Sequence, residues 1–172
     1  MNSSKAHERT LGPKWVTAAL LAGLVAAVTL FLRIPIPKSG GYLNLGDIII
    51  MFTGLYLGPM AGLLVGGVGS AVADAIGYPI FIVPTLVIKG LEGLLSGLPP
   101  KRLGWGRIIG PLTGAAIMVA GYYIVEAFIF GSIGPAAAKA ELPFNIVQGL
   151  VGIVGGFLMY RLINRWSQDV EE

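Results

Sequence analysis

Residues 41–74 read GYLNLGDIIIMFTGLYLGPMAGLLVGGVGSAVAD and contain the apolar run 45–57 and most of a second run, 60–76, separated by Gly58-Pro59. Pro59 suits the first turn of the second run, because the backbone N–H that proline lacks would have no helical partner there. Residues 77–98, GYPIFIVPTLVIKGLEGLLSGL, add a turn at 77–79 and a third apolar run over 80–98. Apolar runs of this length between Gly and Pro breaks predict helices that lie in lipid.

Three further apolar runs flank these, at 15–32, 108–130 and 142–163. The 172 residues are 55% hydrophobic and 12% charged, and the mean hydropathy is +0.78. Soluble domains carry about twice that charged fraction. We therefore predict an all-α integral membrane bundle of six transmembrane helices that forms a single domain. In this interpretation 1–14 is a polar N-terminal tail, 15–165 is the bundle and 166–172 is a charged C-terminal tail, with 131–141 a loop.

The second run is short for a membrane span. Thirteen residues reach about 20 Å at ~1.5 Å per residue, against a hydrocarbon core of ~30 Å. A five-helix bundle with a re-entrant 45–57 segment therefore stays open. Charge favours six spans with both termini in the cytoplasm, because basic residues concentrate on the cytoplasmic side of membrane proteins. That side would hold Lys5, Arg9, Lys14, Lys101, Arg102, Arg107, Arg161 and Arg165, and the other side Arg33, Lys38 and Lys139.

Several functions are excluded by what the sequence lacks. It contains no cysteine, no Walker A motif, no HExxH, no GxSxG and no cluster of histidines. We therefore expect no cofactor, no metal and no catalytic activity. The basic residues lie at the ends of apolar runs, as membrane topology requires, so we expect no nucleic-acid partner.

Charged residues at membrane depth are costly and usually face an internal cavity or a partner. Asp74, Lys89, Glu92 and Glu126 are in this position, and Asp47 is a milder case near the start of its run. Lys89 and Glu92 are three residues apart and share a helix face. They form either a structural ion pair or part of a solute site, and Lys89 could instead pair with Asp74.

Further polar and aromatic residues fall near the outer ends of the helices. Tyr122 and Tyr123 precede Glu126 by about one turn, Asn145 and Gln148 begin the last helix, and Tyr42 and Asn44 lie before the second. Amide side chains both donate and accept hydrogen bonds, so they suit the edge of a heterocycle. They equally suit contacts between helices, and Asn44 could cap the second helix. We expect an outward-facing ligand pocket lined by Tyr42, Asn44, Lys89, Glu92, Tyr122, Tyr123, Glu126, Asn145 and Gln148.

Small residues recur every four positions, which lets helix backbones approach closely in lipid. The glycine stripes are Gly58, Gly62 and Gly66, Gly110 and Gly114, and Gly152 and Gly156. We interpret them as internal packing. Ala18, Ala22 and Ala26 form a further stripe on the first helix, which either packs internally or docks a partner membrane protein.

The stretches 41–74 and 77–98, with their NLGD, LGP and KGLEG sequences, resemble the substrate-binding components of energy-coupling factor (ECF) transporters. The resemblance extends over most of the chain and is strongest to the riboflavin, hydroxymethylpyrimidine and pyridoxine branch. It implies a six-helix protein of the bacterial cell membrane that binds one vitamin from outside. It also implies docking, through the alanine stripe of the first helix, to a scaffold membrane subunit driven by two ATPases.

Two alternatives from other classes remain at this stage. One is a stand-alone carrier that uses Glu126 as a proton site. The other is a small membrane enzyme that uses Glu126 or Asp74, although no nucleophile–base pair accompanies either residue.

Overall fold

The computed structural model describes residues 3–36, 42–98, 106–130 and 134–169, nearly all of them helical. The helices are α1 (Ser3–Phe31), α2 (Gly46–Leu57), α3 (Pro59–Gly77), α4 (Ile82–Gly97), α5 (Gly106–Ile124) and α6 (Gly134–Asp169). A 3-10 turn, η1 (Pro79–Phe81), precedes α4, and a π-helical turn, η2 (Val125–Ile129), follows α5. Strands β1 (Ile34–Pro35) and β2 (Tyr42–Leu43) pair antiparallel between α1 and α2.

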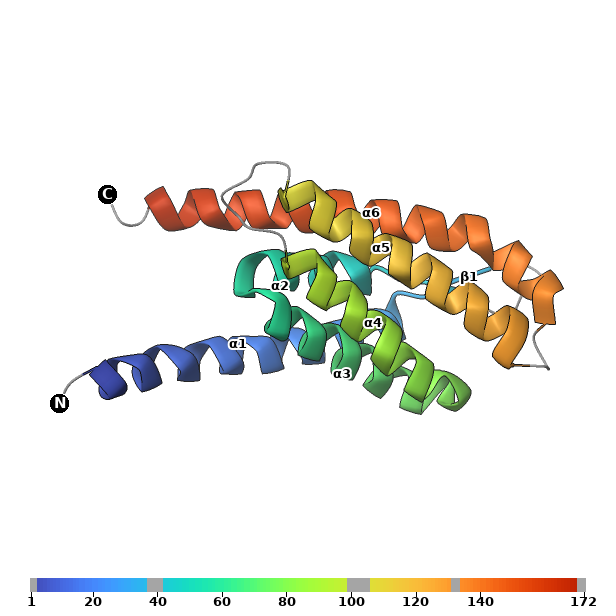
Figure 1. Cartoon of the computed structure of the whole chain (residues 1–172), viewed down its shortest axis with the longest axis horizontal. Helices are drawn as coiled ribbons and strands as arrows, with labels where there is room; N and C mark the ends of the chain where they lie inside the picture. Colours follow the sequence, from blue (N-terminus) through green and yellow to red (C-terminus); the bar gives the residue numbers. More distant parts are fainter. Residues whose placement is uncertain (1–2, 37–41, 99–105, 131–133, 170–172) are drawn as a thin grey trace.

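The helices form one bundle in which α1 begins and α6 ends at the same end, while the β1–β2 ribbon lies toward the other (Figure 1). This arrangement agrees with the predicted even number of helices and with both termini in the cytoplasm. With both termini in the cytoplasm, as the charge pattern predicts, the end that carries β1 and β2 would be the outer end. Helix α3 packs between α1 and α4, α5 packs between α4 and α6, and α2 contacts α1, α3, α4 and α6.

Helix α2 is the short element that the sequence indicated. Five helices among the described residues are long and apolar enough to cross a membrane, and Gly46–Leu57 is a shorter apolar helix. Its 12 residues span about 18 Å at ~1.5 Å per residue. Nine of these residues are buried, because neighbouring helices surround α2. Protein rather than lipid therefore surrounds most of this helix.

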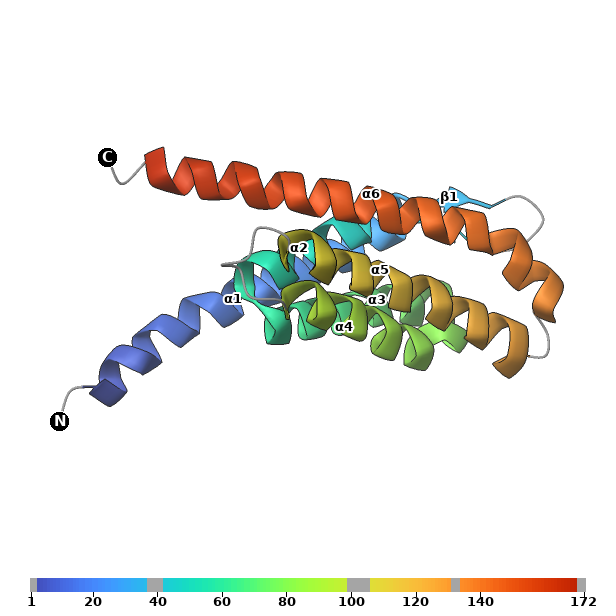
Figure 2. The same ribbon diagram turned by 45° about the horizontal axis from the view of Figure 1, so that its top comes forward.

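The predicted loop over 131–141 is wrong in its C-terminal part. The expected loop over 131–141 ends early, because α6 already begins at Gly134 and continues for 36 residues to Asp169. Its first turns are rich in alanine, the residue with the highest helix propensity. At the other terminus α1 begins at Ser3 within the expected polar tail. The N-terminal half of α1 extends away from the other helices (Figure 2).

Close contact between glycines holds α3 against α4. A side-chain carbon added at Gly62 would meet the backbone of Gly93, and one added at Gly66 would meet the carbonyl of Lys89. On α6, Gly152 and Gly156 admit the side chains and backbone of α2 in the same way. The predicted packing role of these glycines is confirmed. Gly58 differs, because its φ of 94° forms the break between α2 and α3.

Candidate ligand-binding site

A buried charge cluster joins α2 to α4. Lys89 Nζ lies 2.5 Å from Asp47 Oδ1 and 2.9 Å from Glu92 Oε2. All three residues are at most 2% exposed. The ion-pair interpretation of Lys89 and Glu92 is therefore correct, while the pairing of Lys89 with Asp74 is wrong. The sequence placed Asp47 near the start of its apolar run, where a charge is less costly than at membrane depth. Asp47 is nevertheless the closer of the two partners of Lys89, because α2 crosses α4 at this depth.

Gln148 connects the same cluster to α6. Its Nε2 donates to Asp47 Oδ2 at 3.0 Å, and its Oε1 accepts from the backbone N–H of Asn44 at 3.0 Å. The side chain of Asn44 accepts from the N–H of Gly46 at 2.8 Å, which satisfies a free donor at the start of α2. Both ends of the Gln148 amide are therefore used in holding α6 against the β2–α2 junction.

A second polar group lies at the outer ends of α1 and α3. The Tyr42 hydroxyl donates to Asp74 Oδ1 at 3.0 Å. The Arg33 guanidinium lies 4.7 Å and 5.2 Å from the ring centroids of Tyr42 and Tyr78. Burial, assisted by the charge of Asp74, raises the pKa of Tyr42, so its hydroxyl stays protonated and remains a donor. These contacts fix β2 above the end of α3.

An aromatic wall stands beside the charge cluster. Phe81, Tyr122 and Phe130 pack around a core of Ile88, Met118 and Val125. The Phe81 and Phe130 rings meet edge to face at 5.1 Å. The Tyr122 hydroxyl shares a 2.9 Å hydrogen bond with Thr85 Oγ1, and Lys89 Nζ lies 5.8 Å from the Tyr122 ring centroid. Tyr122 thus connects the aromatic wall to the charge cluster.

A carboxyl pair lies where η2 meets the first turns of α6. Glu126, 3% exposed, hydrogen-bonds to the carboxyl group of Glu141, which is 7% exposed. The second oxygen of Glu126, Oε2, is buried without a hydrogen-bond partner in the described part of the chain. Asn145 is 7% exposed and lies one turn after Glu141 on the same face of α6. Glu126 therefore keeps unused hydrogen-bonding capacity in a buried position.

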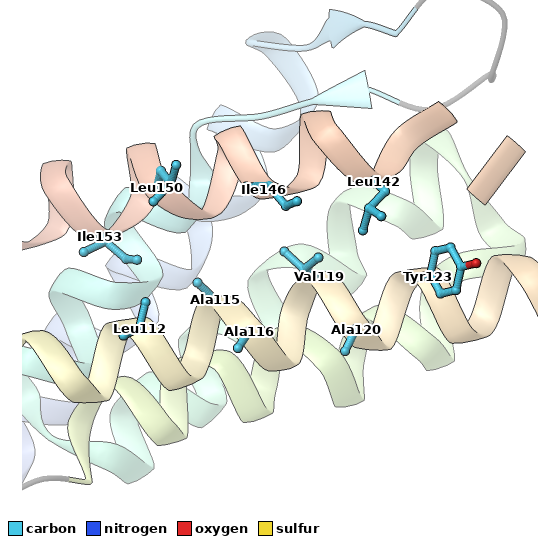
Figure 3. Close-up of a pocket in the computed structure, with 10 residues that line it drawn as sticks. All are labelled: Leu112, Ala115, Ala116, Val119, Ala120, Tyr123, Leu142, Ile146, Leu150 and Ile153. Atoms are coloured by element: carbon cyan, nitrogen blue, oxygen red, sulfur yellow. The ribbon is translucent and has the colours of Figure 1, made fainter. Parts of the chain in front are cut away.

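Tyr123 is separated from these groups. It lines an apolar groove of about 470 Å³ between α5 and α6, on a different face of α5 from Tyr122. In Figure 3 the Tyr123 ring lies at one end of the groove, while Ala115, Ala116 and Leu150 lie along its length. The groove is apolar apart from the Tyr123 hydroxyl, so it suits hydrocarbon better than a polar solute.

The alanine stripe of α1 divides between two environments. Ala18 and Ala26 are 4% and 8% exposed, and Ala18 packs with Val25 and Ile50 in a core cluster. Among residues 14–31 of α1, Ala19 and Gly23 are small and exposed, Ala22 is partly buried, and a carbon added at Gly23 would meet no atom within 4 Å. In this part of α1 the exposed small residues therefore lie one position after Ala18 and Ala22 of the predicted stripe.

Sequence reasoning missed several members of these groups: Arg33, Asp47 as a central partner, Thr85 and Glu141. A signal existed for Glu141, which precedes Asn145 by four residues and so shares its helix face. The sequence prediction places Glu141 in a loop, because the pattern of 134–141 does not mark the start of α6. Arg33 and Thr85 gave no such signal, because their positions depend on how β2 and α5 pack.

Comparison with known proteins agrees with this architecture. The sequence profile of the family described as "ECF-type riboflavin transporter, S component" matches residues 13–165. A protein of Pyrococcus woesei, described as "Uncharacterized protein in gap 3'region", is 47% identical over 150 residues. That match covers 86% of this chain and 99% of the relative.

The fold also matches a solved structure described as "Structure and mechanism of the S component of a bacterial ECF transporter". The TM-score is 0.75 at 20% sequence identity, and the match covers 91% of this chain and 98% of the solved one. S components are multi-pass membrane proteins that bind a substrate and catalyse no reaction. Because the profile covers most of its length, the chain belongs to the family of ECF-type riboflavin transporter S components, the substrate-binding subunits of these transporters.

Proposed function

We propose that this chain binds a vitamin built on an aromatic nitrogen heterocycle (hydroxymethylpyrimidine, pyridoxine or riboflavin) at its outer end. It then delivers the vitamin inward together with an ECF scaffold subunit and two ATPase subunits. The observation that carries the proposal is the chain of contacts that links Asn44, Gln148, Asp47, Lys89 and Tyr122 across the β2–α2 junction, α6, α2, α4 and α5.

The polar side chains divide by whether their bonding capacity is already used. Lys89 is held by Asp47 and Glu92, and both ends of Gln148 are engaged. We assign these four residues to the framework that shapes the site, although Glu92 uses only Oε2 in the ion pair and its Oε1 is buried without a partner in the described residues. Glu126 keeps a buried oxygen without a partner in the described residues, and a buried polar group without a partner costs about 1–3 kcal/mol. A ligand that bonds to this oxygen would recover that free energy.

The aromatic wall would supply the stacking surface. Tyr122 and Phe81 lie with ring centroids 6.3 Å apart, and Tyr122 precedes Glu126 by one turn of the helix. A heterocycle resting against this wall would direct its polar edge toward Glu126 and Asn145. Tyr42 and Asn44 lie at the β2–α2 junction, where we place the entrance to the site.

We place the partner-docking surface on the exposed side of α1, around Ala19 and Gly23. Leu20 and Leu24 flank these small residues and are 71% and 46% exposed. Small residues between exposed leucines permit close helix–helix approach in lipid, where dispersion supplies the attraction. Ala18 and Ala26 would then stabilise α1 against the bundle rather than contact the scaffold.

The function is tested by purifying the full chain from cells and identifying the small molecule released on denaturation by mass spectrometry. We expect one heterocyclic vitamin at close to one molecule per chain. Vesicles that contain the chain alone should then bind this vitamin without accumulating it, and accumulation should require the scaffold, the ATPases and ATP. Accumulation by the chain alone under a proton gradient would contradict the proposal.

A further inference from the structure

The groove between α5 and α6 lies on a surface of the bundle that faces lipid. Both helices are long and apolar enough to cross a membrane, and alanines on α5 leave room beside the larger side chains of α6 (Figure 3). Leu112 and Leu150, which line the groove, are 53% and 55% exposed. The groove is therefore open to the hydrocarbon of the bilayer along its length.

The dimensions of the groove match one lipid chain. Its lining on α6 runs from Leu142 to Ile153, a rise of about 17 Å at ~1.5 Å per residue. That length is close to half of a ~30 Å hydrocarbon core, which is the depth of one leaflet. Spread over this length, the volume of about 470 Å³ corresponds to a mean width of about 6 Å. An α-helix is about 10–12 Å across with its side chains, so the groove is too narrow for a partner helix and fits a single hydrocarbon chain.

A positive charge stands at the outer end of the groove. The α6 residues that line the groove recur every three or four positions and share one helix face. Lys139 precedes Leu142 by three residues, so it continues this face about one turn beyond the groove. Lys139 is exposed, whereas Glu141, its nearest acidic neighbour in sequence, is buried. The Tyr123 hydroxyl lies at the same end of the groove, in the position that tyrosines favour at the boundary between hydrocarbon and headgroups.

We propose that this groove is a lipid site, which binds one hydrocarbon chain of an anionic phospholipid from the leaflet at the outer end. The chain lies between α5 and α6, and the phosphate lies beside the ammonium group of Lys139. Charge complementarity selects the lipid, because a lysine at the membrane surface attracts an anionic headgroup while the apolar lining accepts only hydrocarbon.

A lipid bound in this groove supports the outer half of the bundle. Tyr122 and Tyr123 are adjacent on α5, so the groove and the aromatic wall use opposite sides of the same helical turn. Hydrocarbon in the groove fills the space between α5 and α6 and stabilises their pairing without touching the vitamin. The lipid site goes beyond the proposed function and does not depend on it, because the vitamin is placed on other residues.

The experiment is native mass spectrometry of the full chain, extracted with a mild detergent from vesicles of equal parts phosphatidylglycerol and phosphatidylcholine. We expect one phospholipid retained per chain, with phosphatidylglycerol favoured at least about threefold, a ratio that one lysine near the membrane surface can supply. Ala116→Phe fills the groove and should reduce the retained lipid at least about tenfold. Lys139→Gln should retain the lipid and lose the preference for phosphatidylglycerol. Val147→Phe adds the same ring at an exposed position of α6 outside the groove, so this control should behave as the parent chain.

A second measurement uses thermal stability, since a ligand that binds only the folded chain raises its melting temperature. Phosphatidylglycerol added to the delipidated chain should raise the melting temperature of the parent and of Val147→Phe, and leave that of Ala116→Phe unchanged. Equal lipid retention by Ala116→Phe and the parent, an unchanged headgroup preference in Lys139→Gln, or a second copy of the chain bound in place of lipid would each overturn the proposal. Parent chain that retains no phospholipid would overturn it as well, whether or not the variants fold.

Discussion

Replacing Lys89 by methionine tests whether the charge cluster is the framework of the site. At 2.5 Å and 2.9 Å, each ion pair contributes about 6 kcal/mol of Coulomb attraction at an effective dielectric constant of ~20, before desolvation is subtracted. Methionine preserves most of the volume of the side chain but leaves Asp47 and Glu92 buried without a cation. Breaking a buried pair in this way costs about 3–5 kcal/mol, because the remaining charge is uncompensated. We expect a loss of stability of that size.

The assay is unfolding by SDS in mixed micelles, followed by circular dichroism, with Lys139→Met as the matched control. Lys139 is exposed, so the control should change stability by less than about 0.5 kcal/mol. The double variant Lys89→Met/Glu92→Gln should recover part of the loss, because it removes one of the two stranded charges. Equal stability of Lys89→Met and Lys139→Met would refute the framework role.

Three further predictions concern the entrance, the packing and the docking surface. Tyr42→Phe should lower the free energy of unfolding by about 0.5–1.5 kcal/mol, because the hydrogen bond to Asp74 is lost. The same unfolding assay measures this difference, and no change would show that this bond contributes nothing. Gly62→Leu should destabilise the bundle by more than about 3 kcal/mol, because the new side chain meets the Gly93 backbone and α3 cannot approach α4. A free energy of unfolding equal to that of the parent chain would contradict the close contact. Gly23→Trp should leave vitamin binding unchanged and abolish uptake in vesicles that contain the complete transporter, whereas retained uptake would remove this face of α1 from the docking surface.

The helices could be predicted from sequence because apolar runs between Gly and Pro breaks are a local signal. The break at Gly58-Pro59 correctly separated α2 from α3, and the short length of α2 was evident from the 45–57 run. The start of α6 could not be found in this way. Residues 134–141 include three consecutive alanines together with Pro135 and charged Lys139, a pattern equally compatible with a polar loop, and the packing of this turn against η2 decided between them.

The sequence predicted which residues lie in the buried polar groups, but it predicted less well which of these residues contact one another. Spacing placed Lys89 and Glu92 on one helix face, and the structure joins them. Spacing within one helix could not place Asp47 beside Lys89, because that contact depends on how α2 crosses α4. Tyr122 and Tyr123 are adjacent in sequence but about 100° apart around the helix, so only packing shows that Tyr122 faces the interior and Tyr123 the groove. The same rotation distinguishes buried Ala18 from exposed Ala19.

The central claim is that the outer polar groups hold a heterocyclic vitamin, and an experimental density map of the vitamin-saturated protein tests it most directly. We predict density for one planar ring beside Tyr122, with its polar edge within hydrogen-bond distance of Glu126 and Asn145. Density confined to the groove between α5 and α6, or closure of Glu126 and Asn145 onto other side chains with no ring between them, would contradict the account.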